Sequence, residues 1–238
     1  MIKIEPFGLF WENSKLNKHN IGKLVKNIEI DARTYGDSAR LEYPSEDLKL
    51  VAPYGKLARI IRRRKSERNF SQKAITERQL GSLFYSFAQK KDGTRMVPSA
   101  GGKYPIEVFA FLFTVKSRIS GSVVYYNADN HTLSVIGKCP EWKSSKYCFS
   151  DNLNSMPSVF FVFAAFANRS MKKYGERGGR FVMIEAGQYV QNLSLMAESE
   201  GVCGVEIGSL YDEEIKKLLG IEKTDATICI GYACGNKV

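Results

Sequence analysis

The sequence has 238 residues, with 35 Lys and Arg against 25 Asp and Glu, and a net charge of +10. Apolar residues make up 44% and charged residues 25%, which is near the globular average and excludes a wholly disordered chain. The longest strongly apolar run, VFFVFAAFA, is less than half of the roughly 20 residues that a membrane helix needs. We therefore expect a buried core and no membrane association.

Cysteine and histidine usage limits the chemistry further. The 5 cysteines form no CxxC pair, and an odd number indicates reduced thiols, not a disulfide framework. The N-terminal residues show no secretion signal, so we expect a cytoplasmic location. The two histidines, His19 and His131, are far apart, and we expect no metal site. A Cys/His nucleophile pair built from distant positions is a less favoured alternative.

The chain begins with a polar, irregular stretch of about 50 residues in which Phe10 and Trp11 are candidate apolar anchors. We predict an N-terminal extension over residues 1–52 and one folded domain over residues 53–238. Helices and strands alternate in the domain without a repeat or a Pro/Ser-rich linker, which is typical of a single α+β unit.

Helices are indicated where apolar residues recur three or four apart. They are predicted at residues 53–61, 76–90, 179–200 and 212–220. In the first helix, Leu57, Ile60 and Ile61 are expected to face the core. Thr76 is the predicted N-cap of the second helix, and Gly201 ends the third.

Strands are indicated by apolar and β-branched runs between turn residues. They are predicted at residues 107–115, 122–127, 131–136, 159–167, 203–207 and 226–233. The stretch between the third and fourth strands, residues 138–156, is interpreted as a loop.

A basic block, Arg62 to Lys65, overlaps the sequence RKSERNF at residues 64–70. Such a block is either a solvated helix end or an anion-binding surface. In an extended chain Arg64, Ser66 and Arg68 point the same way, because side chains two residues apart share a face. Two guanidinium groups and a hydroxyl suit a phosphate monoester, but this pattern alone is weak.

Two further motifs accompany the basic stretch. Residues 99–105, SAGGKYP, expose backbone just before an apolar strand, and glycine lets a ligand approach backbone N–H groups closely. Residues 173–192, KYGERGGRFVMIEAGQYVQN, join a polar segment to the long helix. Taken alone, the polar segment is an ordinary exposed loop.

Together these motifs resemble the flavin-dependent nitroreductase superfamily and, within it, the SagB-type azoline dehydrogenases of thiazole/oxazole-modified peptide pathways. The family's R-x-S-x-R-x-F stretch is matched at residues 64–70, and PSAGGxYPxE is matched at 98–107. KYxxRxxR followed by EAGxxxQN is matched from Lys173 to Asn192. A glycine-bearing turn, an LG[IL] helix end and a GY strand are matched by Gly208, Leu219-Gly220-Ile221 and Gly231-Tyr232. Lys103 stands where an apolar residue is commoner.

The resemblance implies an α+β nitroreductase-like fold, with a central, mostly antiparallel sheet flanked by helices, in a homodimer that binds FMN at its interface. The implied cofactor-binding residues are Arg64, Ser66, Arg68, Pro98, Ser99, Ala100, Gly101, Gly102, Gln191, Asn192, Gly208 and Lys237. Arg64, Ser66 and Arg68 are assigned to the phosphate with Lys237 as an extra cation, and a backbone amide near Gly208 to flavin N5. Local packing of Asn192 and an ordinary turn at Gly208 are the plain alternatives.

The resemblance also implies oxidation of a thiazoline or oxazoline in a ribosomally made precursor peptide, with a cyclodehydratase partner and oxygen as electron acceptor. Lys173 is the candidate base and Tyr174 the proton relay, with the reverse order left open. Either side chain is protonated near neutral pH and is a poor base unless burial or a nearby cation lowers its pKa. One alternative is an NAD(P)H-dependent nitroreductase or quinone reductase of the same fold. Another is a non-catalytic, basic nucleic-acid-binding protein.

Overall fold

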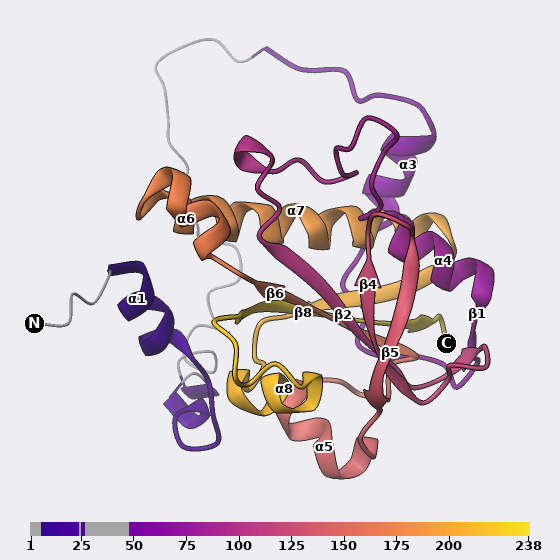
Figure 1. The fold of residues 1–238 in the computed structure, drawn as a ribbon. Coiled ribbons are helices and arrows are strands. Elements are labelled where there is room, and N and C mark those ends of the chain that lie inside the picture. Colours follow the sequence, from indigo (N-terminus) through magenta and orange to yellow (C-terminus); the bar gives the residue numbers. More distant parts are fainter. Residues whose placement is uncertain (1–5, 24, 27–47) are drawn as a thin grey trace, which may run out of the picture.

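The computed structural model describes residues 6–23, 25–26 and 48–238, so about half of the predicted N-terminal extension lies outside the described residues. A six-stranded sheet forms its centre, in the order β5-β4-β2-β6-β8-β7, and every neighbouring pair is antiparallel (Figure 1). The strands are β2 (Ile106–Leu112), β4 (Ser122–Asn127), β5 (Thr132–Lys138), β6 (Val159–Ala165), β7 (Val202–Ile207) and β8 (Thr227–Asn236). A short parallel pair, β1 (Ile75–Thr76) and β3 (Val115–Lys116), forms a separate two-stranded sheet.

The fully buried strand β6 explains why the sequence contains a continuous apolar run. Alternate residues of a strand point to opposite faces of the sheet. Accordingly, Phe161 and Phe163 join one core layer, whereas Phe160 and Val162 join the other. Each side of the sheet therefore has its own apolar layer, and β6 contributes to both.

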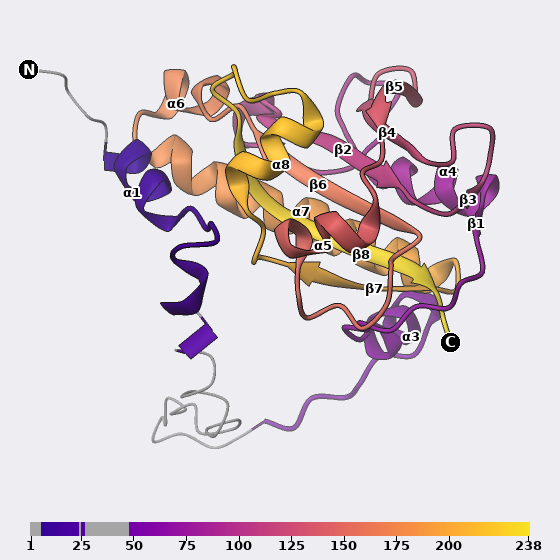
Figure 2. The ribbon, with the colours of Figure 1, turned by 90° about the horizontal axis from the view of Figure 1, so that it is seen from below.

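Helices cover the two faces of the sheet (Figures 1 and 2). One face carries α4 (Glu77–Tyr85), α6 (Asn168–Tyr174) and α7 (Arg177–Ser199), with α3 (Lys56–Arg63) next to α7. The other face carries α5 (Trp142–Phe149) and α8 (Asp212–Leu219). The predicted α+β class and the antiparallel sheet flanked by helices are confirmed.

The predicted cap of α4 is present. The Thr76 hydroxyl accepts a hydrogen bond from Gln79 N at 3.2 Å, and the Gln79 side chain accepts one from Thr76 N at 3.0 Å. This reciprocal capping box satisfies two N–H groups at the helix start. Leu80, Leu83 and Phe84 then point into the core, as their spacing predicts.

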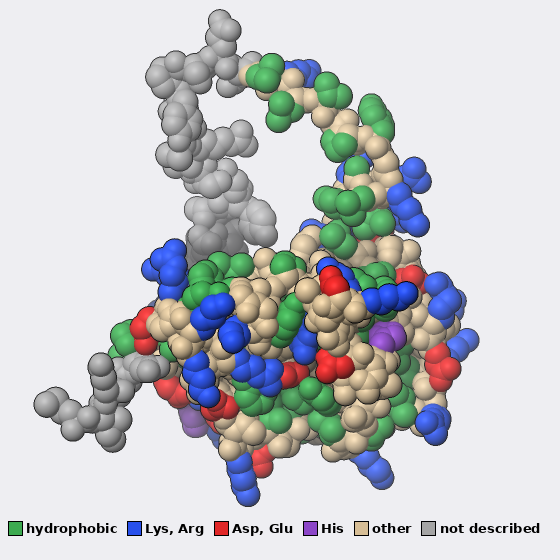
Figure 3. Space-filling view, turned by 45° about the horizontal axis from the view of Figure 1, so that its top comes forward, with side chains coloured by type: hydrophobic (Ala, Val, Ile, Leu, Met, Phe, Trp, Pro, Cys, Tyr) green, Lys and Arg blue, Asp and Glu red, His purple; other side chains and the backbone are tan. Residues whose placement is uncertain are grey.

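Helix α3 forms close to the predicted position, but its predicted orientation is wrong. Leu57 and Ile61 are 62% and 53% exposed, and only Ile60 is half-buried. The helix touches α7 along one side, and no described part of this chain covers its other apolar residues. Hydrophobic side chains also follow the described segment that leads into α3 (Figure 3).

The predicted loop at 138–156 contains helix α5, so this interpretation is also wrong. Its apolar residues Cys148 and Phe149 are buried beneath the sheet, and Trp142 packs against Phe149 with ring centroids 5.7 Å apart. The two serines in the middle of α5 hide the helical pattern in the sequence. Packing against the second core layer stabilises this short helix more than its intrinsic propensity does.

Helix α1 (Pro6–Ser14), which the sequence did not predict, packs where α6 meets α7. The Phe7 ring fills space that Gly179 leaves open, and Phe7 N donates a hydrogen bond to Glu176 Oε2 at 2.7 Å. Trp11 is buried, as expected of an anchor, but Phe10 is 51% exposed and does not act as one. None of the described helices is long and apolar enough to cross a membrane.

Candidate functional site

The predicted phosphate-binding stretch runs along the edge strand β7. Ser66 forms a parallel bridge with Gly204, and Glu67 N donates a hydrogen bond to Gly204 O at 2.9 Å. Arg64 has extended backbone angles, φ −55° and ψ 127°. The extended geometry on which the sequence argument depends is therefore present at the start of the stretch.

The cations at this edge differ in what they contact. Three of them are paired with carboxylates: Arg63 and Lys237 with Glu198 at 3.0 and 3.1 Å, and Lys65 with Glu67 at 3.2 Å. Arg64 and Arg68 form no ion pair with any residue that the structure describes. By charge, these two guanidinium groups suit a phosphate ligand. The Ser66 hydroxyl lies 3.5 Å from Glu206 Oε2 and so contacts a carboxylate.

The SAGG stretch forms a single turn of 3-10 helix, η1 (Ala100–Gly102). Gly101 and Gly102 have φ values of 60° and 64°, in the left-handed region that glycine adopts most easily. The Ser99 hydroxyl accepts a hydrogen bond from Tyr104 N at 2.8 Å, which closes the turn. We refer to residues 98–102 as the glycine turn.

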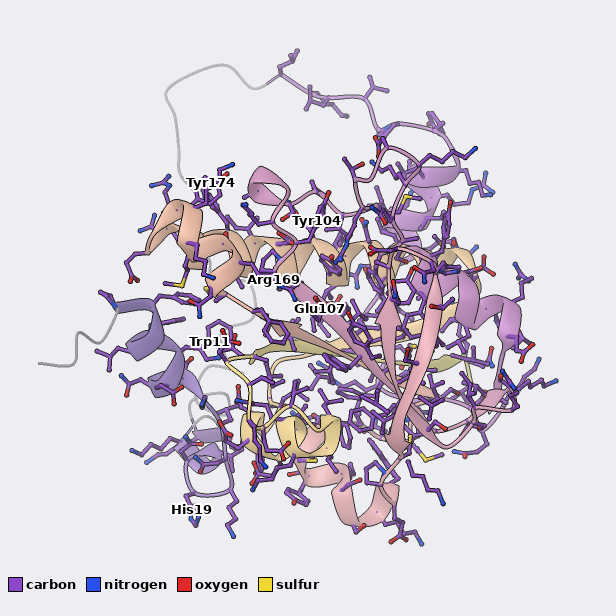
Figure 4. All side chains as sticks on the ribbon, viewed as in Figure 1. Trp11, His19, Tyr104, Glu107, Arg169 and Tyr174 are labelled. Carbon is purple, nitrogen blue, oxygen red and sulfur yellow. The ribbon has the colours of Figure 1, made fainter. Side chains whose placement is uncertain are left out.

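A polar network fixes the end of the glycine turn to the sheet and to α6 (Figure 4). Arg169 of α6 donates to Tyr104 O at 3.0 Å and forms an ion pair with Glu107, whose other oxygen accepts from the Tyr125 hydroxyl at 2.9 Å. The Tyr104 hydroxyl accepts from Arg95 N at 3.0 Å. The Tyr and Glu of the YPxE motif thus hold the glycine turn in place.

Lys173 and Tyr174 occupy the last turn of α6 and contact the glycine turn. A Cβ placed on Gly101 would overlap the Tyr174 hydroxyl and would come within 2.7 Å of Lys173 Nζ. Lys173 Nζ lies 5.3 Å from the centre of the Tyr174 ring, and the Phe181 ring packs edge-on against Tyr174 at 5.0 Å. Two motifs separated by about 70 residues in the sequence therefore meet at one point.

The remaining predicted residues lie elsewhere. The Asn192 amide donates to Ser86 O and Met96 O at 3.4 and 3.3 Å, which is the local packing role considered above, and Gln191 is exposed. Gly208 lies directly after β7 and lines a cavity of about 170 Å³ that Trp11 also lines.

The predicted cofactor residues thus fall into two groups near opposite ends of α7, a helix of 23 residues that spans about 35 Å. Glu198, near its C-terminal end, binds cations beside the phosphate-binding stretch, whereas Phe181, near its N-terminal end, contacts Tyr174. One chain does not bring all of the predicted residues together.

Glu185 of α7 is a candidate site residue that the sequence assigned only to a motif. Glu185 is 2% exposed, and its Oε1 atom has no hydrogen-bond partner among the described residues. Burial raises the pKa of this carboxyl to about 7, although Ser99 and the Arg95 guanidinium act in the opposite direction. A signal was available, because an acidic residue at position 185 interrupts the apolar face that Val182 and Tyr189 define.

Arg95 and Arg169 were also missed. Both lie outside the quoted motifs, and their role depends on contacts that only the folded chain makes. Lys103, the unusual residue of the glycine turn motif, has an exposed side chain and forms no ion pair within the described residues.

Comparison with known proteins identifies the family. The model of the nitroreductase family matches residues 61–235, which is most of the chain. The chain therefore belongs to the nitroreductase family, and the predicted superfamily is confirmed. The match begins inside the predicted 53–238 domain; the domain boundary itself stays a prediction.

Several proteins are similar to this chain in sequence or in fold. A Methanocaldococcus jannaschii protein provisionally named a nitroreductase is 27% identical over 190 residues, covering 79% of this chain and 93% of that protein. A chain of the E. coli microcin synthetase McbBCD complex, with truncated pro-MccB17 bound, is 19% identical, with a TM-score of 0.70 over 93% of this chain and 95% of that chain. A Staphylococcus epidermidis protein provisionally named an NAD(P)H:FMN oxidoreductase is 14% identical, with a TM-score of 0.53 over 81% of this chain and 92% of that chain. The two structures share the fold.

Proposed function

We propose that this protein is an FMN-dependent dehydrogenase that oxidises thiazoline or oxazoline rings of a ribosomally made peptide to azoles. The observation that carries the proposal is the contact of Lys173 and Tyr174 with Gly101. The Lys-Tyr and SAGG motifs are the ones that distinguish SagB-type enzymes from ordinary nitroreductases in the resemblance. Their meeting in the fold supports a shared role in one reaction site.

The reaction removes a proton from one ring carbon and a hydride from its neighbour. Bound FMN would supply the hydride acceptor, with oxygen as the final electron acceptor. Lys173 would accept the proton and Tyr174 would relay it, or the reverse, because the polar ends of both side chains reach the same point on the glycine turn. Lys173 is exposed and Tyr174 half-buried, so a substrate can approach this pair from solvent.

A second copy of the chain would complete the site. The phosphate-binding stretch and the Lys-Tyr pair lie near opposite ends of α7, which supports a cofactor site shared between two chains. Apolar side chains at the α3 side are unusually exposed for a single chain, including Tyr54 at 94% and Leu57 at 62%. Exposed apolar patches of this kind mark interaction surfaces, and we infer a homodimer.

The partners would be a precursor peptide and a cyclodehydratase, which forms the rings that this protein oxidises. The fold shared with a chain of the microcin synthetase complex supports this assignment, since that complex was determined with pro-MccB17 bound. The family match and the M. jannaschii relative favour a second candidate, an NAD(P)H-dependent nitroreductase. The nucleic-acid-binding alternative has no comparable support.

The two candidates differ in what reduces the bound cofactor. We expect a synthetic peptide with one internal thiazoline or oxazoline to bleach the 450 nm flavin absorbance without oxygen, and NAD(P)H to bleach it far more slowly. Mass spectrometry should show the peptide losing two hydrogen atoms as the ring becomes aromatic. Rapid bleaching by NAD(P)H, with no reaction of the thiazoline or the oxazoline peptide, would favour the reductase and contradict the dehydrogenase proposal.

The phosphate assignment predicts a difference between adjacent cations. Arg64→Ala should weaken FMN binding by about tenfold or more, because a charged hydrogen bond contributes about 1.5–3 kcal/mol. Lys65→Ala also removes one positive charge, but Lys65 is already paired with Glu67. This variant should therefore change FMN binding far less. Equilibrium dialysis of the yellow protein measures both. Equal losses in the two variants would show that only net charge matters at this edge.

A further inference from the structure

A cavity of about 300 Å³ lies between the glycine turn and the first half of α7. Pro98, Ser99 and Ala100 form one wall; Phe181, Glu185 and Gln188 belong to the other. The cavity is separate from the phosphate-binding stretch at the β7 edge. It is instead adjacent to the Lys-Tyr pair, because Ala100 precedes Gly101 and Phe181 packs against Tyr174.

Glu185 provides a buried polar atom of this cavity, Oε1, that has no hydrogen-bond partner among the described residues. Glu185 is only 2% exposed. On the opposite wall, the Ser99 hydroxyl accepts a hydrogen bond from Tyr104 N. An unsatisfied buried acceptor is costly, and a ligand that donates a hydrogen bond would remove that cost.

The charges around Glu185 restrict the kind of donor. The titratable groups that act on it or respond to it are Arg95 before the glycine turn, Tyr189 on α7 and Cys229 on β8. The carboxyl would repel an anion, and the Arg95 guanidinium acts against a cation. We take a neutral N–H donor as the ligand class, because Pro98 and Phe181 provide apolar walls beside the carboxyl.

We propose that Glu185 binds the main-chain amide N–H that follows the azoline ring of the substrate peptide. This proposal rests on the proposed function. That amide is attached, through one carbonyl group, to the ring carbon whose proton is removed. Holding it in the cavity would place the ring carbon beside Lys173 and Tyr174. Glu185 is thus a substrate-binding residue of the same site.

The protonation of Glu185 gives the proposal a pH dependence. An N–H donor binds an ionised carboxylate more strongly than a protonated one. Since burial raises the pKa of Glu185 to about 7, peptide affinity should rise as the pH increases through neutrality. The reverse linkage also holds, because bound peptide should lower the pKa of Glu185.

The test uses the azole-bearing product peptide, which the FMN-loaded protein cannot oxidise further, and an analogue methylated on the nitrogen of that amide. Calorimetry should show that methylation weakens binding to the wild type by about tenfold, the loss expected for a charge-assisted hydrogen bond. Binding of the unmethylated peptide should tighten between about pH 6 and about pH 8. Equal affinity for the two peptides at both pH values overturns the proposal without any protein variant.

Glu185→Gln then connects the effect to the residue. The variant should bind the unmethylated peptide more weakly at about pH 8, with little pH dependence and little response to methylation. Glu222→Gln, at an exposed carboxylate after α8, is the matched control and should behave as the wild type. If Glu185→Gln instead loses FMN while its FMN-loaded fraction binds peptide normally, the carboxyl serves the cofactor and the proposal is overturned.

Failure of this assignment can be told apart from failure of the proposed function. A wild type that oxidises azoline peptides yet ignores amide methylation remains a dehydrogenase with a different role for Glu185. A wild type that neither binds nor oxidises peptides with either ring is not a peptide azoline dehydrogenase. That result removes both proposals.

Discussion

Lys173→Ala and Tyr174→Phe should each lower azoline oxidation by about a hundredfold or more while FMN stays bound. Positioned acid-base groups typically contribute about 10²- to 10⁴-fold to a rate. Both side chains meet at Gly101, whereas the candidate phosphate residues lie beyond the opposite half of α7. Single-turnover flavin reduction by the azoline peptide, with the 450 nm absorbance of each purified variant, measures turnover and FMN content separately.

Lys172→Ala is the matched control for this pair. Lys172 lies on the same helix turn and is also exposed, but the atoms nearest to a Cβ on Gly101 belong to Lys173 and Tyr174. It should therefore retain turnover. If Lys173→Ala and Tyr174→Phe both oxidise the peptide at the wild-type rate, the base and relay roles are wrong in either order.

Much of the fold could be predicted because long periodic segments carry their own signal. Strand β6 is apolar on both sides because it separates two core layers, and α7 repeats apolar residues at helical spacing over 23 residues. The Thr76 cap was predictable because both partners of the capping box lie within three residues. Local rules suffice where the deciding contacts are local.

The errors concern segments whose environment is set by distant parts of the fold. The apolar residues of α3 suggested an inward face, but the described chain offers them no cover, which is understandable if a second copy does. Helix α5 was missed because its few apolar residues pack against a core layer built from distant parts of the chain, which the local sequence pattern does not reveal. Periodicity reports that a residue is apolar, not what lies opposite it.

The candidate site could be predicted as a set of motifs but not as a geometry. Sequence order could not show that Lys237 pairs with Glu198, that Asn192 holds two backbone carbonyls, or that Glu185 keeps one oxygen unpaired. Nor could it show that Tyr104 and Glu107 of the YPxE motif serve to fix the glycine turn through Arg169. Those roles arise from residues far apart in the chain.

The packing at Gly101 leads to the second prediction with a large effect, for Gly101→Ala. Its Cβ would overlap the Tyr174 hydroxyl and crowd Lys173 Nζ, so both groups must move away from the turn. A displacement of about 1 Å can cost about 10²-fold in rate, and we expect peptide oxidation to fall by that order. The left-handed backbone, with φ of 60°, should also cost about 1–2 kcal/mol of stability.

Gly102→Ala separates these two effects, because Gly102 has nearly the same backbone angle, φ of 64°, but open space where its Cβ would lie. Both variants should lose similar stability in urea unfolding, whereas only Gly101→Ala displaces the Lys-Tyr pair and should lose much more oxidation rate. Similar rates in the two variants would mean that backbone strain explains the loss. In that case the contact between the glycine turn and the Lys-Tyr pair would not be part of the reaction site.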